Sequence, residues 1–118
     1  MGQFTVTFWG VRGSHATPGK DTVKFGGNST CIEVNAGGNI LVFDAGGGII
    51  NLGRSLRERH LTPASPDRRE SLTVYLFFTH THHDHTEGLP FFEPAYFGKT
   101  VMHMFGPRML TSDLEDVL

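Results

Sequence analysis

Residues 72–85 read LTVYLFFTHTHHDH and join a strand pattern directly to a cluster of histidines. Its first half, residues 72–78, is an almost unbroken run of apolar and β-branched side chains, which is typical of a central β-strand covered on both faces. Its second half adds four histidines and an aspartate, which therefore lie at the carboxyl end of the predicted strand. We expect a sheet that carries a histidine-rich segment at one end of its strands.

The spacing of the polar residues in this segment fits a metal site. Zn²⁺ is bound by imidazole nitrogens and carboxylate oxygens, several of which must converge on one ion. Alternate residues of an extended segment point the same way, so His80 and His82 can hold one ion, and Asp84 and His85, where the chain turns, can reach a second. We predict these four residues as metal ligands. The alternative, a polar loop that binds metal only adventitiously, is less consistent with so many ligands in so short a stretch.

The other histidines are not predicted to be ligands. His83 does not fit the spacing of the four predicted ligands, and we expect it to point elsewhere, behind the ligands or into a pocket. His15, His60 and His103 each stand alone in the sequence, so ordinary surface or core positions are the better interpretation.

Alternating side chains predict further strands before this stretch. Phe4, Val6 and Phe8 alternate with polar residues, as in a strand with one buried face, and the strands 3–43 should form one sheet layer. Two of these strands, residues 29–34 and 40–43, flank the turn NAGGN and should pair antiparallel. Residues 10–28, rich in glycine, predict a long loop with a functional role.

The hydrophobic period changes from 2 to 3.6 after Asp44, which predicts a helix near residues 48–60 packed on the sheet. The three glycines at 46–48 resemble a phosphate cradle, but no Gly-x-x-x-x-Gly-Lys pattern follows, so we interpret them as a tight passage from strand to helix. A last strand is expected over residues 101–105. The predicted fold class is therefore α/β, with a mixed sheet and covering helices.

The pattern His-x-His-x-Asp-His at the end of a strand resembles the signature of the metallo-β-lactamase superfamily. Four flanking segments resemble the branch grouped with ribonuclease Z and class II cyclic-nucleotide phosphodiesterases. They are FWGVRGS (8–14), GGNSTCIEV (26–34), LVFDAG (41–46) and GLPFF (88–92).

This resemblance implies a fold, a ligand set and a cofactor. The fold is an αββα sandwich, and residues 1–118 would be the N-terminal half of one such domain. By resemblance His80 and His82 hold the first of two divalent ions and Asp84 and His85 the second, with Zn²⁺ expected and Mn²⁺ or Fe²⁺ as alternatives. Asp44 matches an aspartate that supports the site by hydrogen bonding. From the residues alone, a position at the start of a helix is an equally good interpretation of Asp44.

The family's remaining ligands and general acid have no counterpart in these residues. Ser112 and Glu115 form a capping box for a helix of barely two turns, which predicts a domain truncated at its C-terminal end. We therefore expect the chain by itself to be a poor catalyst, with an apolar face left open on the strands 74–78 and 101–105.

The implied function is metal-dependent hydrolysis of a phosphodiester, in a nucleotide-like or RNA substrate, by a bridging hydroxide that Asp84 orients. The same ions polarise a carbonyl as readily, so hydrolysis of a thioester, lactone or β-lactam is the alternative. A third hypothesis is a catalytically incomplete fragment that only binds metal or pairs with another chain. An arginine set could form a basic face for phosphate, although a solvated surface is the more ordinary interpretation. It comprises Arg54, Arg57, Arg59, Arg68 and Arg69.

Composition sets the remaining expectations. With 12 acidic and 10 basic residues, the net charge of −2 gives no general attraction to nucleic acid or membranes. No apolar run approaches the ~20 residues of a membrane-spanning helix, and we expect a cytoplasmic protein, open to assembly as a homo-oligomer. Cys31, the single cysteine, is interpreted as a small buried hydrophobic residue in a reducing compartment.

Overall fold

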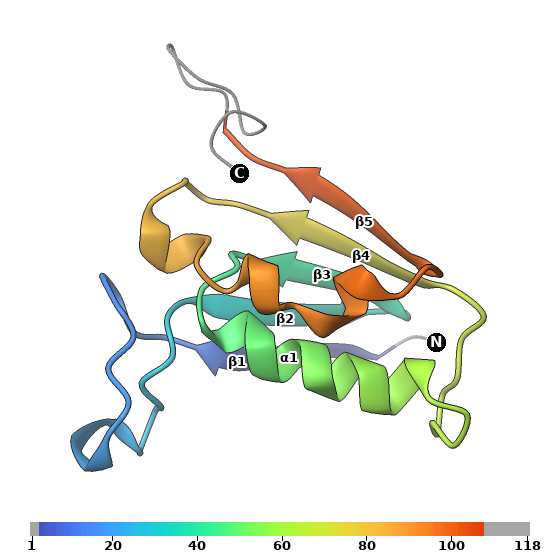
Figure 1. The fold of residues 1–118 in the computed structure, drawn as a ribbon, viewed down its shortest axis with the longest axis horizontal. Coiled ribbons are helices and arrows are strands. Elements are labelled where there is room, and N and C mark those ends of the chain that lie inside the picture. Colours follow the sequence, from blue (N-terminus) through green and yellow to red (C-terminus); the bar gives the residue numbers. More distant parts are fainter. Residues whose placement is uncertain (1–2, 108–118) are drawn as a thin grey trace.

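Five strands form one mixed sheet in the order β1-β2-β3-β4-β5, as Figure 1 shows. The computed structural model describes residues 3–107. The strands are β1 (Phe4–Gly10), β2 (Cys31–Ala36), β3 (Asn39–Phe43), β4 (Leu72–Phe77) and β5 (Thr100–Phe105). The expected α/β class and the single sheet layer are both confirmed.

The first three strands run antiparallel and the last three run parallel. The predicted pairing of β2 with β3 is confirmed, and their turn places Gly37 and Gly38 at φ 58° and 87°, which side chains with a Cβ rarely adopt. Two crossovers complete the sheet, one from β3 to β4 and one from β4 to β5. The carboxyl ends of β3, β4 and β5 therefore lie at the same end of the sheet.

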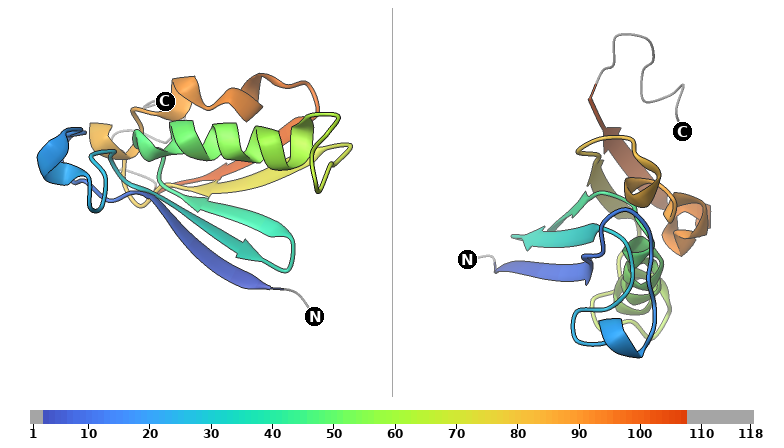
Figure 2. Two further views of the ribbon diagram at one scale, coloured as in Figure 1. Left: turned by 90° about the horizontal axis from the view of Figure 1, so that it is seen from below. Right: turned by 90° about the vertical axis from the view of Figure 1, so that its left-hand side faces the viewer.

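Helices cover one side of the sheet. The predicted helix is confirmed as α1 (Gly48–Leu56), which continues as the π-helical turn η2 (Arg57–Leu61). It places Ile49, Leu52 and Leu56 against the strands, where all three are fully buried. The shorter 3₁₀ turns are η1 (Lys20–Thr22), η3 (His83–His85), η4 (Leu89–Phe91) and η5 (Glu93–Tyr96). Figure 2 shows α1, η4 and η5 on the same side of the sheet.

The opposite face of the sheet is apolar and open. The register aligns one residue from every strand into a row, which we call the aromatic row: Phe8, Ile32, Phe43, Phe77 and Phe105. The rings of Phe43 and Phe77 stack at 5.3 Å, and those of Phe77 and Phe105 at 5.0 Å.

This open face agrees with the apolar face expected on the strands 74–78 and 101–105, and it corrects two other expectations. Phe4, Val6 and Phe8, expected as the buried face of β1, are 70%, 46% and 66% exposed, because Phe8 belongs to the aromatic row and alternate residues of a strand share its side of the sheet.

The second correction concerns β4. The sequence predicts that residues 72–78 are covered on both faces, but in β4 fully buried and half-buried residues alternate. Leu76 faces the helices, whereas Tyr75 and Phe77 lie on the open face. The physical reason is that both crossovers return on one side of the sheet, so the described residues put no helix on the other.

Two further expectations concern the chain as a whole. The capping box of Ser112 and Glu115 lies outside the described residues. Within residues 3–107, none of the helices has both the length and the apolar character needed to cross a membrane.

Candidate metal centre

The predicted ligands gather where β4 ends. Phe78 donates its backbone N–H to the carbonyl oxygen of Phe105 at 2.8 Å, and the chain then leaves the sheet. From each of His80, His82 and Asp84, one ligand atom lies within 4.8 Å of those of the other two. These three residues could therefore hold a metal ion.

His85 lies at the same place. Its ring is 4.0 Å from that of His80, centroid to centroid, and its Nε2 is 3.2 Å from Oδ2 of Asp84. The structure thus brings together all four predicted ligands. How they are divided between two ions stays a prediction.

Asp84 is the buried member of this group, in the first turn of η3. Its Oδ2 accepts a hydrogen bond from the backbone N–H of Ser14 at 3.0 Å, which comes from the long loop after β1. Burial raises the pKa of this carboxyl, but the Ser14 hydrogen bond and the neighbouring His85 and His80 outweigh it and lower the pKa below its usual value. Asp84 therefore carries a negative charge that can face a cation.

Asp44 supports the group from behind. It follows β3 directly, is buried, and adopts a left-handed φ of 66° that aspartate tolerates better than most residues. Its Oδ2 lies 2.9 Å from Nδ1 of His85, and its Oδ1 accepts the backbone N–H of Thr79 at 2.8 Å. No side-chain cap begins α1, whose N-cap is Gly47. Of the two interpretations of Asp44, the structure favours support of the site.

Thr79 joins Asp44 to a second ligand, and sequence reasoning missed it. Its hydroxyl donates to Oδ2 of Asp44 at 2.9 Å, so it can only accept from Nδ1 of His80, 3.0 Å away. Nδ1 of His80 thus contacts a hydroxyl and Nδ1 of His85 a carboxylate, which leaves Nε2 as the atom that each ring can offer to an ion; in His85 this atom faces Asp84. The signal that could have found Thr79 is a hydroxyl residue between the apolar strand and the first histidine.

Backbone hydrogen bonds join the turn after β3 to the turn after β4, which carries the predicted ligands. Ala45 donates its N–H to the carbonyl of His85 at 2.7 Å, and Gly88 donates to the carbonyl of Ala45 at 2.8 Å. A Cβ at Gly46 would collide with the backbone oxygen of Asp84, so only glycine allows this approach. The predicted tight passage from strand to helix is confirmed. Gly46 is required there because its backbone lies against the backbone of Asp84.

His15, His60 and His103 lie at ordinary surface or core positions, as predicted. His83 points away from the ligands, as predicted, but it lies in solvent and not behind the ligands or in a pocket, and its Nε2 is 3.2 Å from Oε2 of Glu87. His15 lies on the exposed loop and His103 on the open face, where it stacks on Tyr75 at 5.2 Å. His60 is buried, and its Nδ1 lies 2.9 Å from the carbonyl of Asp67.

The arginines do not form one basic face. Arg54 and Arg57 pair with Glu93 at 3.9 and 3.3 Å, and Arg59 pairs with the buried Glu33 at 3.0 Å. Arg69 pairs with Asp67 at 3.6 Å, and together with Arg68, Glu70 and Lys99 it lines a separate polar hollow. The ordinary interpretation as a solvated surface is the better one.

The donor set fits a divalent ion. It combines imidazoles with one buried, ionised carboxylate, and a hydroxyl or a carboxylate contacts the inner ring nitrogen of His80 and of His85. This is the arrangement that orients histidine ligands in zinc proteins. Compared with models of known protein families, with curated proteins and with solved structures, the chain gives no match.

Proposed function

We propose that this chain is a metal-dependent hydrolase of the metallo-β-lactamase superfamily and acts on phosphodiesters of a nucleotide-like or RNA substrate. One observation carries the proposal. His80, His82 and Asp84 converge within 4.8 Å where β4 ends, in the His-x-His-x-Asp-His pattern of that superfamily. The pattern alone could be chance, but a convergent donor group backed by Asp44 is what a working site requires.

The proposed fold is the N-terminal half of an αββα sandwich. In support, helices cover one face of the sheet, while the aromatic row and its neighbours leave the other face apolar. An exposed apolar face of this width is unusual for a finished surface and suits contact with a second sheet.

Two ions, most simply Zn²⁺, are expected at the four ligands. When bound, they would supply Lewis-acid polarisation of the phosphoryl oxygen and lower the pKa of water. Mn²⁺ and Fe²⁺ favour similar ligands, so the identity of the metal rests on analysis of the loaded protein.

The chain's own residues have separate roles in this proposal. Asp84 would hold metal through one carboxylate oxygen and would accept a hydrogen bond from the attacking water or hydroxide, which aligns it for attack. The Ser14 N–H holds the Asp84 carboxylate in place, at 3.0 Å. Asp44 and Thr79 keep the inner nitrogens of His85 and His80 engaged, which fixes the direction of both rings.

The test is turnover by the zinc- or manganese-loaded chain on two substrates in parallel, bis(p-nitrophenyl) phosphate and an aryl thioester. We expect slow but metal-dependent hydrolysis with preference for the phosphodiester. The rate should be slow because the chain offers two ligands to each ion, whereas a catalytic zinc site typically has three protein ligands. His82→Ala should abolish the activity, and His103→Ala, on the open face, should not. Faster turnover of the thioester would contradict the proposed phosphodiester hydrolysis and favour the alternative, hydrolysis of a thioester, lactone or β-lactam.

A further inference from the structure

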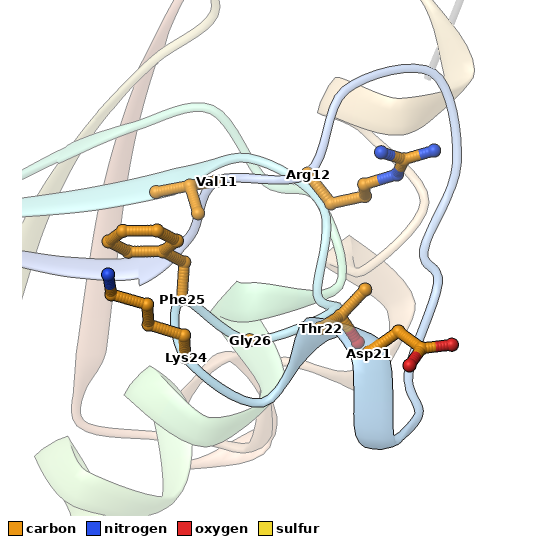
Figure 3. A pocket seen from close by; sticks show the side chains of 7 residues that line it. All are labelled: Val11, Arg12, Asp21, Thr22, Lys24, Phe25 and Gly26. Carbon is orange, nitrogen blue, oxygen red and sulfur yellow. The ribbon is translucent and has the colours of Figure 1, made fainter.

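The long loop after β1 encloses a pocket that the metal centre does not use. Seven residues line a cavity of about 250 Å³, shown in Figure 3. They come from two segments, the residues just after β1 and the turn η1 with the residues that follow it: Val11, Arg12, Asp21, Thr22, Lys24, Phe25 and Gly26. The volume lies slightly below the ~300–1,000 Å³ of sites that take a whole small molecule, so it suits one ring system of a larger ligand.

The loop is a folded structure anchored beside the metal centre. Its two arms are joined by hydrogen bonds from Arg12 N–H to Asn28 and from Thr17 N–H to Gly27, at 3.0 and 2.6 Å. Between these arms, Ser14 donates its backbone N–H to Asp84. Figures 1 and 2 place the loop at the same end of the sheet as the turn that follows β4.

The walls of the pocket combine an aromatic ring with cations. Phe25 is 75% exposed and Val11 46% exposed, so both present apolar surface to solvent. The Lys24 ammonium lies 5.2 Å from the centre of the Phe25 ring. Throughout residues 3–107, no carboxylate lies within 4.0 Å of the charged nitrogens of Arg12 or Lys24. Asp21 and Thr22 add oxygens that can accept hydrogen bonds.

This chemistry matches a nucleobase joined to a phosphate. A planar base can stack on an exposed aromatic ring, and the cations of the pocket attract the phosphate to which it is attached. An aliphatic anion would make no use of the ring, and an uncharged apolar ligand would make no use of the cations.

We propose that this pocket, which we call the loop pocket, is a base-binding subsite in which the base of a nucleotide-like substrate stacks on Phe25 while its phosphodiester reaches the metal centre. The position of the phosphodiester rests on the proposed function. The affinity of the pocket for a base is independent of the proposed function, because Phe25 and Lys24 are not metal ligands.

The test measures binding of AMP, ribose 5-phosphate and adenosine to the full chain in EDTA, by calorimetry. Without metal, any preference for AMP over ribose 5-phosphate reports contacts to the base. We expect AMP to bind at least about fivefold more tightly than ribose 5-phosphate, the lower limit for one stacked base. Phe25→Ala should abolish the difference and Phe25→Tyr should retain it. Lys24→Gln should weaken AMP more than adenosine.

Val23→Ala is the matched control. Val23 is as exposed as Phe25, at 76%, and lies two residues away, but it does not line the pocket. Equal affinity for AMP and ribose 5-phosphate, or an unchanged preference in Phe25→Ala, would overturn the subsite. Zinc binding by the same variants is measured separately. A chain that prefers AMP but neither binds zinc nor cleaves a phosphodiester would refute the proposed function and leave the base-binding pocket standing.

Discussion

Oδ2 of Asp44 lies 2.9 Å from Nδ1 of His85, although α1 and β4 separate the two residues along the chain. The contact joins the end of β3 to the turn after β4. It turns Nε2 of His85 towards Asp84, 3.2 Å away, and so fixes a ligand that its own turn would leave free to rotate.

Replacing Asp44 by asparagine should weaken metal binding. An asparagine side chain would tolerate the left-handed backbone but would carry no charge to hold the His85 ring, and loss of such a supporting carboxylate typically costs about 10–100-fold in affinity. Zinc affinity is measured by competition with a chromogenic chelator. Asp67→Asn, at an exposed aspartate away from the site, is the control, and equal affinities in the two variants would contradict the supporting role.

His82→Ala should lose bound zinc, and His103→Ala should retain it. His82 contributes a ligand atom to the convergent group, whereas His103 stacks on Tyr75 on the open face. Elemental analysis after gel filtration gives the metal content of each variant. His83→Ala provides a closer control, since His83 is adjacent in sequence but exposed and paired with Glu87. If His82→Ala binds as much zinc as the wild type, His82 is not a ligand.

Gly46→Ala should destabilise the chain and lower its zinc affinity together. The added Cβ would collide with the backbone of Asp84 and of Ser29, and overpacking of this kind costs about 1–3 kcal/mol. Gly13→Ala, where a Cβ meets no atom within 4 Å, should change the free energy of unfolding by less than about 0.5 kcal/mol. Urea denaturation and zinc titration are compared for both variants, and a neutral Gly46→Ala would show that the two turns can separate without cost.

Arg59→Ala should destabilise the fold far more than Arg57→Ala, two residues earlier in the same helical turn. Arg59 donates to both oxygens of Glu33, which is buried and also accepts from Nε1 of Trp9 at 3.1 Å. Removing one partner of a buried pair costs about 3–5 kcal/mol, and the lower end is expected because Arg59 is 35% exposed. Arg57 pairs with Glu93, and because their side chains are 42% and 38% exposed the pair is partly solvated, so its loss should cost about 1 kcal/mol or less. Similar urea midpoints for the two variants would contradict this difference.

Cys31 should resist thiol reagents in the folded chain. Burial raises the pKa of its thiol, and the carboxylates of Asp44 and Glu33 raise it further, so little thiolate forms near neutral pH. Reaction with Ellman's reagent at pH 8 should be slower in buffer than in urea by a factor on the order of 100 or more, since it requires opening of the sheet. Rapid reaction of one thiol in buffer would mean that β2 is exposed in solution.

The strands, the helix and the ligand cluster could be predicted because each rests on a local pattern. Alternation of Phe4, Val6 and Phe8 identifies a strand, and Ile49, Leu52 and Leu56 identify a helix, without knowledge of any partner. Crowding of ligands within residues 80–85 is equally local.

The supporting contacts could not be predicted because they depend on which turns meet in space. Neither the spacing of Ser14 and Asp84 nor that of Asp44 and Thr79 marks them as partners. The error at residues 72–78 has a related cause. An unbroken apolar run indicates that both faces of a strand avoid water, but it does not indicate which part of the molecule covers each face.

Two members of the aromatic row lie next to the metal centre. Phe43 directly precedes Asp44, and a single residue separates Phe77 from Thr79. A second sheet packed on that row would restrain the two strand ends that position His80 and His85. Covering the row and binding zinc would then be thermodynamically linked, and by reciprocity each would strengthen the other by the same factor. The zinc affinity of this chain would therefore report whether its open face is covered, with tighter binding when a second sheet packs on it.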